Sequence, residues 1–98
     1  NQESIFKSPD IYIIAMGENA IKFSFNTANE LRSKKDLIVI TDTLRRSLKS
    51  QMKDANRLKV KFAIIIGDNE LSDNTVSIKN MSTGKQKNIP IDGIVNYF

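Results

Sequence analysis

The amino-acid sequence predicts a three-layer α/β/α domain around a mixed sheet of about five strands. Two patterns predict this class. Three short apolar runs rich in β-branched residues alternate with two longer stretches of helical period. After Gly67 the pattern changes to a strand of alternating polarity, which is typical of a position nearer the edge of a sheet. The three apolar runs are Asp10–Met16, Leu37–Ile40 and Val60–Ile66.

Two amphipathic helices are expected between these strands. The first spans Glu18–Lys35, with an acid near its start and basic residues near its end that complement the helix dipole. The second runs from about Leu44 to Leu58. This order of elements favours parallel strands joined by right-handed crossovers. The expected buried stripes are Ile21, Phe25, Ala28 and Leu31 in the first helix, and Leu44, Leu48, Met52 and Ala55 in the second.

The other segments complete a single domain. Residues 1–8 are interpreted as a linker or tail, and residues 9–98 as the domain itself. The alternation in the fourth strand predicts one buried face and one polar face. The expected C-terminal elements are a loop or single helical turn at Asp68–Asn74, strands at Thr75–Asn80 and Gln86–Ile89, and a short helix at Ile91–Phe98.

Composition excludes several classes of function. With 98 residues there is room for one core but little for a deep active site. The chain has no cysteine and no histidine, so it lacks thiolate ligands and the most common general base. We therefore predict no catalytic residue, metal site or cofactor in this domain. No run approaches the ~20 apolar residues of a membrane span, and a cytoplasmic location is expected.

Positive charge is concentrated in one segment. The formal net charge is +4, yet the stretch from Arg45 to Lys61 holds seven basic residues and one acid, Asp54. One face of the second helix could follow a phosphate backbone, with additional support from the free N–H groups at the helix start. A solvated surface helix explains the charge equally well. The basic residues assigned to phosphate binding are Arg45, Arg46, Lys49, Lys53 and Arg57.

Two polar residues are candidates for contacts with nucleobases. Glu70 follows Gly67 at the carboxyl end of the third strand, where open α/β sheets bind ligands, and its carboxylate could accept hydrogen bonds from a base. Lys79 lies on the polar face of the fourth strand and could reach the same rim. Glu18 and Glu70 could instead form an acid/base pair, although Glu18 is better explained as a helix-start acid. Gly17 and Gly67 belong to no phosphate-loop motif.

Four short motifs follow one another in a fixed order between Arg45 and Gln86. They are Arg46, Ser47, Leu48, Lys49 and Gln51, then Ile66, Gly67 and Glu70, then Thr75, Val76 and Lys79, and finally Thr83, Gly84 and Gln86. This ordered set resembles the C-terminal anticodon-binding domain of histidyl-tRNA synthetases, and the resemblance covers about Pro9 to Phe98. Arg45 departs from it, because the family usually has glycine there.

The resemblance implies a mixed five-stranded sheet that holds the anticodon stem-loop of histidine tRNA. It implies that Glu70 and Lys79 contact anticodon bases, as the matching residues of threonyl relatives do. It also implies a catalytic domain in the same polypeptide that uses ATP and Mg²⁺, and a homodimeric parent enzyme. Two alternatives remain at this point: a regulatory or protein-interaction module in a synthetase-like protein that charges no tRNA, and a small nucleotide-binding enzyme.

Overall fold

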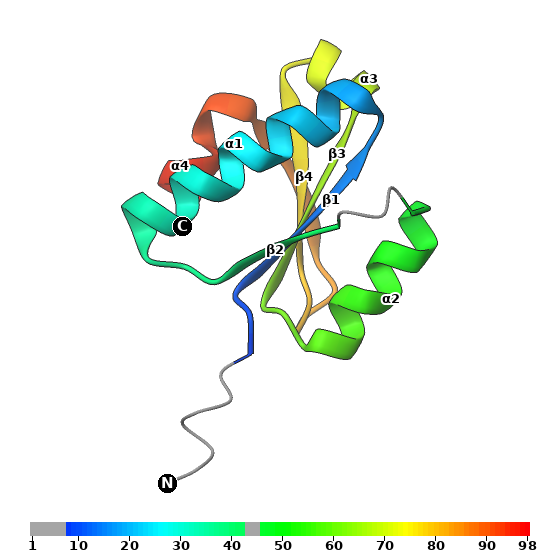
Figure 1. Ribbon diagram of the computed structural model, residues 1–98, viewed down its shortest axis with the longest axis vertical. Helices are drawn as coiled ribbons and strands as arrows, with labels where there is room; N and C mark the ends of the chain where they lie inside the picture. Colours follow the sequence, from blue (N-terminus) through cyan, green and yellow to red (C-terminus); the bar gives the residue numbers. More distant parts are fainter. Residues whose placement is uncertain (1–7, 43–45) are drawn as a thin grey trace, which may run out of the picture.

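The computed structural model describes residues 8–42 and 46–98, and it confirms the α/β class (Figure 1). Within these ranges strands and helices alternate as far as the fourth strand, which is followed by a fifth strand and two short C-terminal helical segments. Residues 1–7 of the expected tail lie outside the described ranges. The elements are β1 (Ile11–Met16), α1 (Glu18–Lys35), β2 (Val39–Thr41), α2 (Leu48–Leu58), β3 (Phe62–Gly67), α3 (Asp68–Ser72), β4 (Thr75–Asn80), β5 (Gln86–Pro90), the 3₁₀ turn η2 (Ile91–Gly93) and α4 (Ile94–Tyr97).

The five strands form one mixed sheet in the order β2-β1-β3-β4-β5. The central strand β1 pairs in parallel with β2 and β3, whereas β4 and β5 are antiparallel to their neighbours. β1 is apolar along its whole length because both of its faces are covered. The predicted change of strand type after Gly67 is therefore confirmed, and the segment between β3 and β4 forms the short helix α3, which agrees with the single helical turn named as one of two alternatives.

The two faces of the sheet carry separate cores. Ile11, Ile13 and Ile64 pack with α1 and α4 on one face, and Tyr12 and Ile14 pack with α2 on the other. The alternation follows from the two-residue period of a strand. Figure 1 shows α1 and α4 on one side of the sheet and α2 on the opposite side, which is the predicted three-layer arrangement.

The face that carries α2 changes from apolar to polar between β3 and β4. Each row of paired residues that crosses the sheet shows the change. α2 covers the apolar part, and the polar part is half-buried on β4 and exposed on β5. We call this part the open polar face; it consists of Thr75, Ser77, Lys79, Gln86 and Asn88. The two rows are Ile14, Ile65, Ser77 and Asn88, and Tyr12, Ala63, Lys79 and Gln86.

The second helix begins four residues later than predicted, at Leu48. Ser47 is its N-cap, and the Ser47 Oγ accepts a hydrogen bond from the backbone N–H of Ser50 at 3.2 Å. Leu48 is 44% exposed, so it is not part of the buried stripe. Gln51 is buried in its place, because its Nε2 donates to the carbonyl of Arg46 at 2.7 Å.

The predicted stripe of α1 is also partly wrong. Phe25 is 44% exposed and lies outside the buried stripe, whereas Ser24 and Thr27 are buried. Ser24 fits in the interior because its hydroxyl donates to the carbonyl of Ile21 at 2.7 Å and is thereby satisfied within the helix.

Candidate nucleic-acid interface

A groove of about 380 Å³ lies where β1 and β3 end. Its walls come from the first turn of α2 and from α3. This is the carboxyl edge of the parallel strands, the usual ligand position in open α/β sheets. Gln51 fixes one wall, because its Nε2 also lies 3.4 Å from the Ala15 carbonyl at the end of β1. The lining residues are Met16, Leu48, Ile65, Gly67, Asp68, Asn69 and Glu70.

The Glu70 carboxylate lies directly against the backbone of Gly67. A β-carbon built on Gly67 would meet Glu70 Oε2 at 2.9 Å, so glycine leaves the space that the carboxylate occupies. Glu70 is half-buried, and among residues 8–42 and 46–98 it has no hydrogen-bond or ion-pair partner. An unpaired carboxylate at a groove wall can accept two hydrogen bonds from one ligand.

Asp68, which sequence reasoning did not single out, has a structural role at the same edge. Its Oδ1 accepts a hydrogen bond from the backbone N–H of Ala20 at 3.1 Å, near the start of α1. Gly17 has a φ of 110°, and the Asp68 carboxylate packs against it. Asp68 therefore ties α3 to α1.

Lys79 lies on the same face as Glu70 but not at the same rim. It pairs with Ala63, four residues before Gly67 in β3. At about 3.3 Å per residue, the two levels are roughly 13 Å apart along the strand. The expectation that both residues share one rim is wrong. They mark two ends of a longer surface that includes the open polar face.

The basic residues of the α2 region divide into two groups. Lys49 and Lys53 are exposed and, in the described part of the chain, have no ion-pair partner. Arg57 is exposed too, with its Nη2 3.4 Å from Asp54 Oδ1. Arg46 precedes α2, so the expectation that it lies on one face of the second helix is wrong. Arg45 lies outside the described residues.

Arg46 is bound by two carboxylates of the same chain. Its Nε and Nη2 donate to Asp42 Oδ1 at 2.9 and 2.8 Å, and its backbone N–H donates to Asp42 Oδ2 at 2.9 Å. Its Nη2 also pairs with Asp54 and lies 3.5 Å from the Tyr12 hydroxyl. We call Tyr12, Asp42, Arg46 and Asp54 the Arg46 cluster. The cluster fastens the segment before α2 to the sheet.

The close contacts within the Arg46 cluster shift the pKa values of Asp54, Arg46 and Tyr12. Hydrogen bonding to Arg46 holds the pKa of Asp54 below its usual value, and Arg57 adds to this effect. The bonds to Asp54 and Asp42 raise the pKa of Arg46 further. Burial raises the pKa of the Tyr12 hydroxyl, and the nearby charges of Asp42 and Asp54 act in the same direction.

The lowered pKa of Asp54 predicts an acid-dependent loss of stability. Its contribution is complete above the ordinary carboxyl pKa of about 3.9 and is lost as the pH falls through the lower folded-state pKa. The free energy of unfolding is measured in urea from about pH 6 to about pH 2. Asp54→Asn should be less stable than wild type at pH 6, and the free energies of the two proteins should converge in acid. Asp92→Asn, on the opposite face, is the control. A constant gap at all pH values would contradict the assignment.

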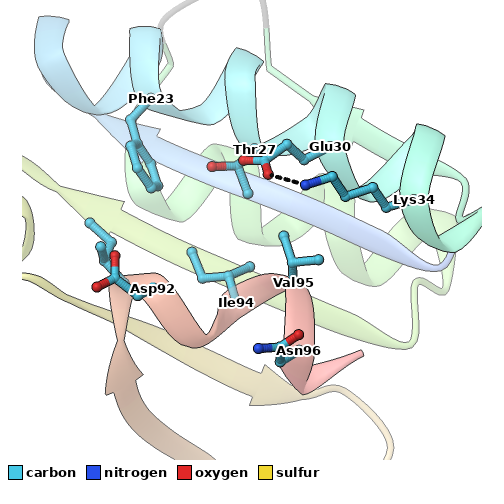
Figure 2. A pocket seen from close by; sticks show the side chains of 9 residues that line it. Phe23, Thr27, Glu30, Lys34, Asp92, Ile94, Val95 and Asn96 are labelled. Atoms are coloured by element: carbon cyan, nitrogen blue, oxygen red, sulfur yellow. Dashed lines mark hydrogen bonds and ion pairs between the residues drawn. The ribbon is translucent and has the colours of Figure 1, made fainter.

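A second hollow of about 380 Å³ lies on the other face of the sheet, between α1 and the C-terminal helices. Figure 2 shows Phe23 on α1 and Ile94 and Val95 on α4 pointing into it from opposite sides, with the Glu30–Lys34 ion pair at its rim. Of the assigned residues that the structure describes, none lines this hollow. The described residues contain no acidic group of three that could hold a metal ion, and none of their helices could cross a bilayer.

The comparisons with known proteins identify the family. A sequence model of the anticodon binding domain matches residues 10–98. The chain belongs to this family. The histidine–tRNA ligase of Staphylococcus aureus is 42% identical to this anticodon-binding domain over 89 residues, which cover 91% of the chain and 21% of the ligase. The domain thus spans about a fifth of the length of the curated relatives it matches.

Solved structures agree with the family and the fold. The crystal structure of apo S. aureus histidyl-tRNA synthetase matches the domain with a TM-score of 0.86 and 41% identity, over 93% of this chain and 26% of that one. The RNA binding domain of threonyl-tRNA synthetase from Cryptosporidium parvum matches with a TM-score of 0.78 at 16% identity, over 93% and 23% of the two chains. The second likeness shows the shared fold. The predicted resemblance to histidyl-tRNA synthetases is confirmed.

Proposed function

We propose that this domain recognises the anticodon of histidine tRNA as part of a histidyl-tRNA synthetase. The observation that carries the proposal is the Glu70 carboxylate, which has no partner in the described part of the chain. It lines a groove that opens beside the open polar face of β4 and β5. Single-stranded loops expose the hydrogen-bonding edges of their bases, and such a surface can read them. The similarity to histidine–tRNA ligases supports histidine tRNA as the ligand.

The two kinds of polar residue have different roles in this proposal. Lys49 and Lys53 bind phosphates and position the RNA, while Glu70 and Lys79 contact bases and supply specificity. Arg57 contributes at the end of the same helix. Arg46 acts through the geometry of the segment before α2, because two carboxylates already bind its guanidinium.

Aminoacylation itself is assigned to a catalytic part of the polypeptide outside this sequence. We place the sites for ATP and Mg²⁺ there, together with the contacts of a homodimer, and we place the enzyme in the cytoplasm. This domain would then hold the tRNA at the anticodon while the distant acceptor end is charged.

Removing the positive charge of the exposed Lys49 and Lys53 should weaken RNA binding without changing its selectivity. Log affinity falls as log salt concentration rises. For the Lys49→Gln and Lys53→Gln variants this decline should become less steep, by about 0.7 to 1 in slope for each phosphate that is no longer neutralised. The measurement is a salt titration of binding to an RNA hairpin with the histidine anticodon. Lys34→Gln on α1, which removes a cation already paired with Glu30, should leave the slope unchanged.

The same assay tests the proposed function as a whole. Wild-type domain should bind the histidine hairpin more tightly than a hairpin of the same stem with another anticodon. Equal binding of both hairpins would overturn anticodon recognition and favour a regulatory or protein-interaction module.

A further inference from the structure

The open polar face contains one side chain whose orientation is fixed by a neighbour. Ser77 on β4 and Asn88 on β5 are paired in register, and the Ser77 hydroxyl donates to Asn88 Oδ1 at 2.6 Å. Because Ile89 packs with the core on the α1 side, Asn88 lies on the α2 side. The Asn88 side chain is therefore exposed but held in one orientation.

The hydrogen bond determines what Asn88 presents to a ligand. A side-chain amide has one acceptor oxygen and an NH₂ group with two donors. Ser77 occupies the oxygen, so the NH₂ group remains for an external acceptor. Among the described residues no protein group accepts from it. Because this hydrogen bond already orients the amide, a ligand would bind with a smaller loss of side-chain freedom there.

The charges and spacing around Asn88 fit one base of a bound anticodon. Ser77 pairs with Ile65, two residues before Gly67, so Asn88 lies roughly 7 Å along the strands and about 10 Å across them from the level of Gly67 and Glu70. Lys79 lies on the next row and adds a positive charge. The subsite is thus cationic and donor-rich, which suits a base with a keto oxygen and disfavours one with an amino group.

We propose that Asn88, oriented by Ser77, is a specificity-determining residue that donates to O4 of the uracil in the histidine anticodon. Histidine codons begin with cytosine and adenine, so the two anticodon bases that pair with them are an adjacent guanine and uracil. The Glu70 carboxylate matches the N1–H and N2–H donors of guanine, and Asn88 then lies beside the neighbouring uracil. This inference rests on the proposed function and extends it to residues outside the family motifs.

Swapping a keto group for an amino group tests the assignment. Two RNA hairpins are compared, one with the histidine anticodon and one in which its uracil is replaced by cytosine. Wild-type domain should bind the cytosine hairpin roughly tenfold more weakly. Asn88→Asp, which replaces the donor with an acceptor, should reduce this ratio to about one or invert it. Ser77→Ala should give an intermediate ratio.

The controls separate this inference from the proposed function. Asn96→Asp makes the same chemical change on the exposed surface of α4 and should leave the ratio at its wild-type value. Thermal unfolding checks that each variant is folded. An Asn88→Asp variant that keeps the wild-type ratio, or a wild type indifferent to the uracil swap, would overturn the role of Asn88. Anticodon recognition itself would fall only if wild type also failed to distinguish the histidine hairpin from one with an unrelated anticodon.

Discussion

Glu70→Gln should reduce the ability of the domain to distinguish guanine from adenine in the anticodon by about 10- to 100-fold. The carboxylate can accept from both N1–H and N2–H of guanine, whereas adenine has an acceptor at N1 and no 2-amino group. Glutamine keeps the size of the side chain but replaces one acceptor oxygen with a donor. Loss of a bidentate pair corresponds to about 1–3 kcal/mol of discrimination. The measurement is the ratio of affinities for hairpins that differ only at the guanine.

A second variant changes the position of this carboxylate but not its charge. Gly67→Ala would bring a β-carbon to 2.9 Å from Glu70 Oε2, so the carboxylate must shift. The Gly67→Ala variant should lose part of the discrimination between guanine and adenine, and the salt dependence of its RNA binding should equal that of wild type. Glu30→Gln, an exposed carboxylate of α1, is the matched control and should change neither quantity. If Glu70→Gln lowered the affinities for both hairpins equally, Glu70 would not be a base-reading residue.

Gly17→Ala should lower the free energy of unfolding by about 3 kcal/mol. Gly17 has a φ of 110°, a conformation in which a residue with a β-carbon is strained by about 1–3 kcal/mol. The new β-carbon would also lie 2.5 Å from Asp68 Oδ2. Asp68 would have to move away from the N–H of Ala20, which removes a helix-start bond of about 1 kcal/mol. Urea unfolding measures the total.

Two other glycines separate the contributions to this loss. Gly84 also has a positive φ, 76°, but nothing lies within 4 Å of a built β-carbon, so Gly84→Ala should show the backbone strain alone. Gly93 has a φ of −91° and open space, so Gly93→Ala should cost little. If Gly17→Ala and Gly84→Ala were equally destabilising, the packing of Asp68 against Gly17 would contribute nothing.

The sequence patterns that depend on local period predicted most of the fold. The positions of apolar residues along the chain predicted both the buried strand β1 and the half-covered strand β4. The start of α2 was not predictable in this way. It depends on the capping by Ser47 and on the long-range contact of Gln51 with the end of β1, which no periodicity encodes.

The candidate site was less predictable because it depends on pairs that the fold brings together. Glu70 was identified from its position after a parallel strand. The two carboxylates that bind Arg46 were not identified from the sequence. Asp42 lies before α2 and Asp54 lies within it, so only the folded chain brings both to the Arg46 guanidinium. Counting charges along the chain therefore overestimated the free cations near α2. The bond between Ser77 and Asn88 depends on the register of β4 and β5, which the turn between them determines.

The short and polar edges of the sheet also affect how the protein behaves at high concentration. β2 is only three residues long, and β5 carries Lys87 and ends at Pro90, which has no N–H to offer to another strand. Adding a strand from a second copy along β5 would bring Lys87 against the incoming chain. The open polar face therefore lies beside an edge that discourages intermolecular strand addition and aggregation.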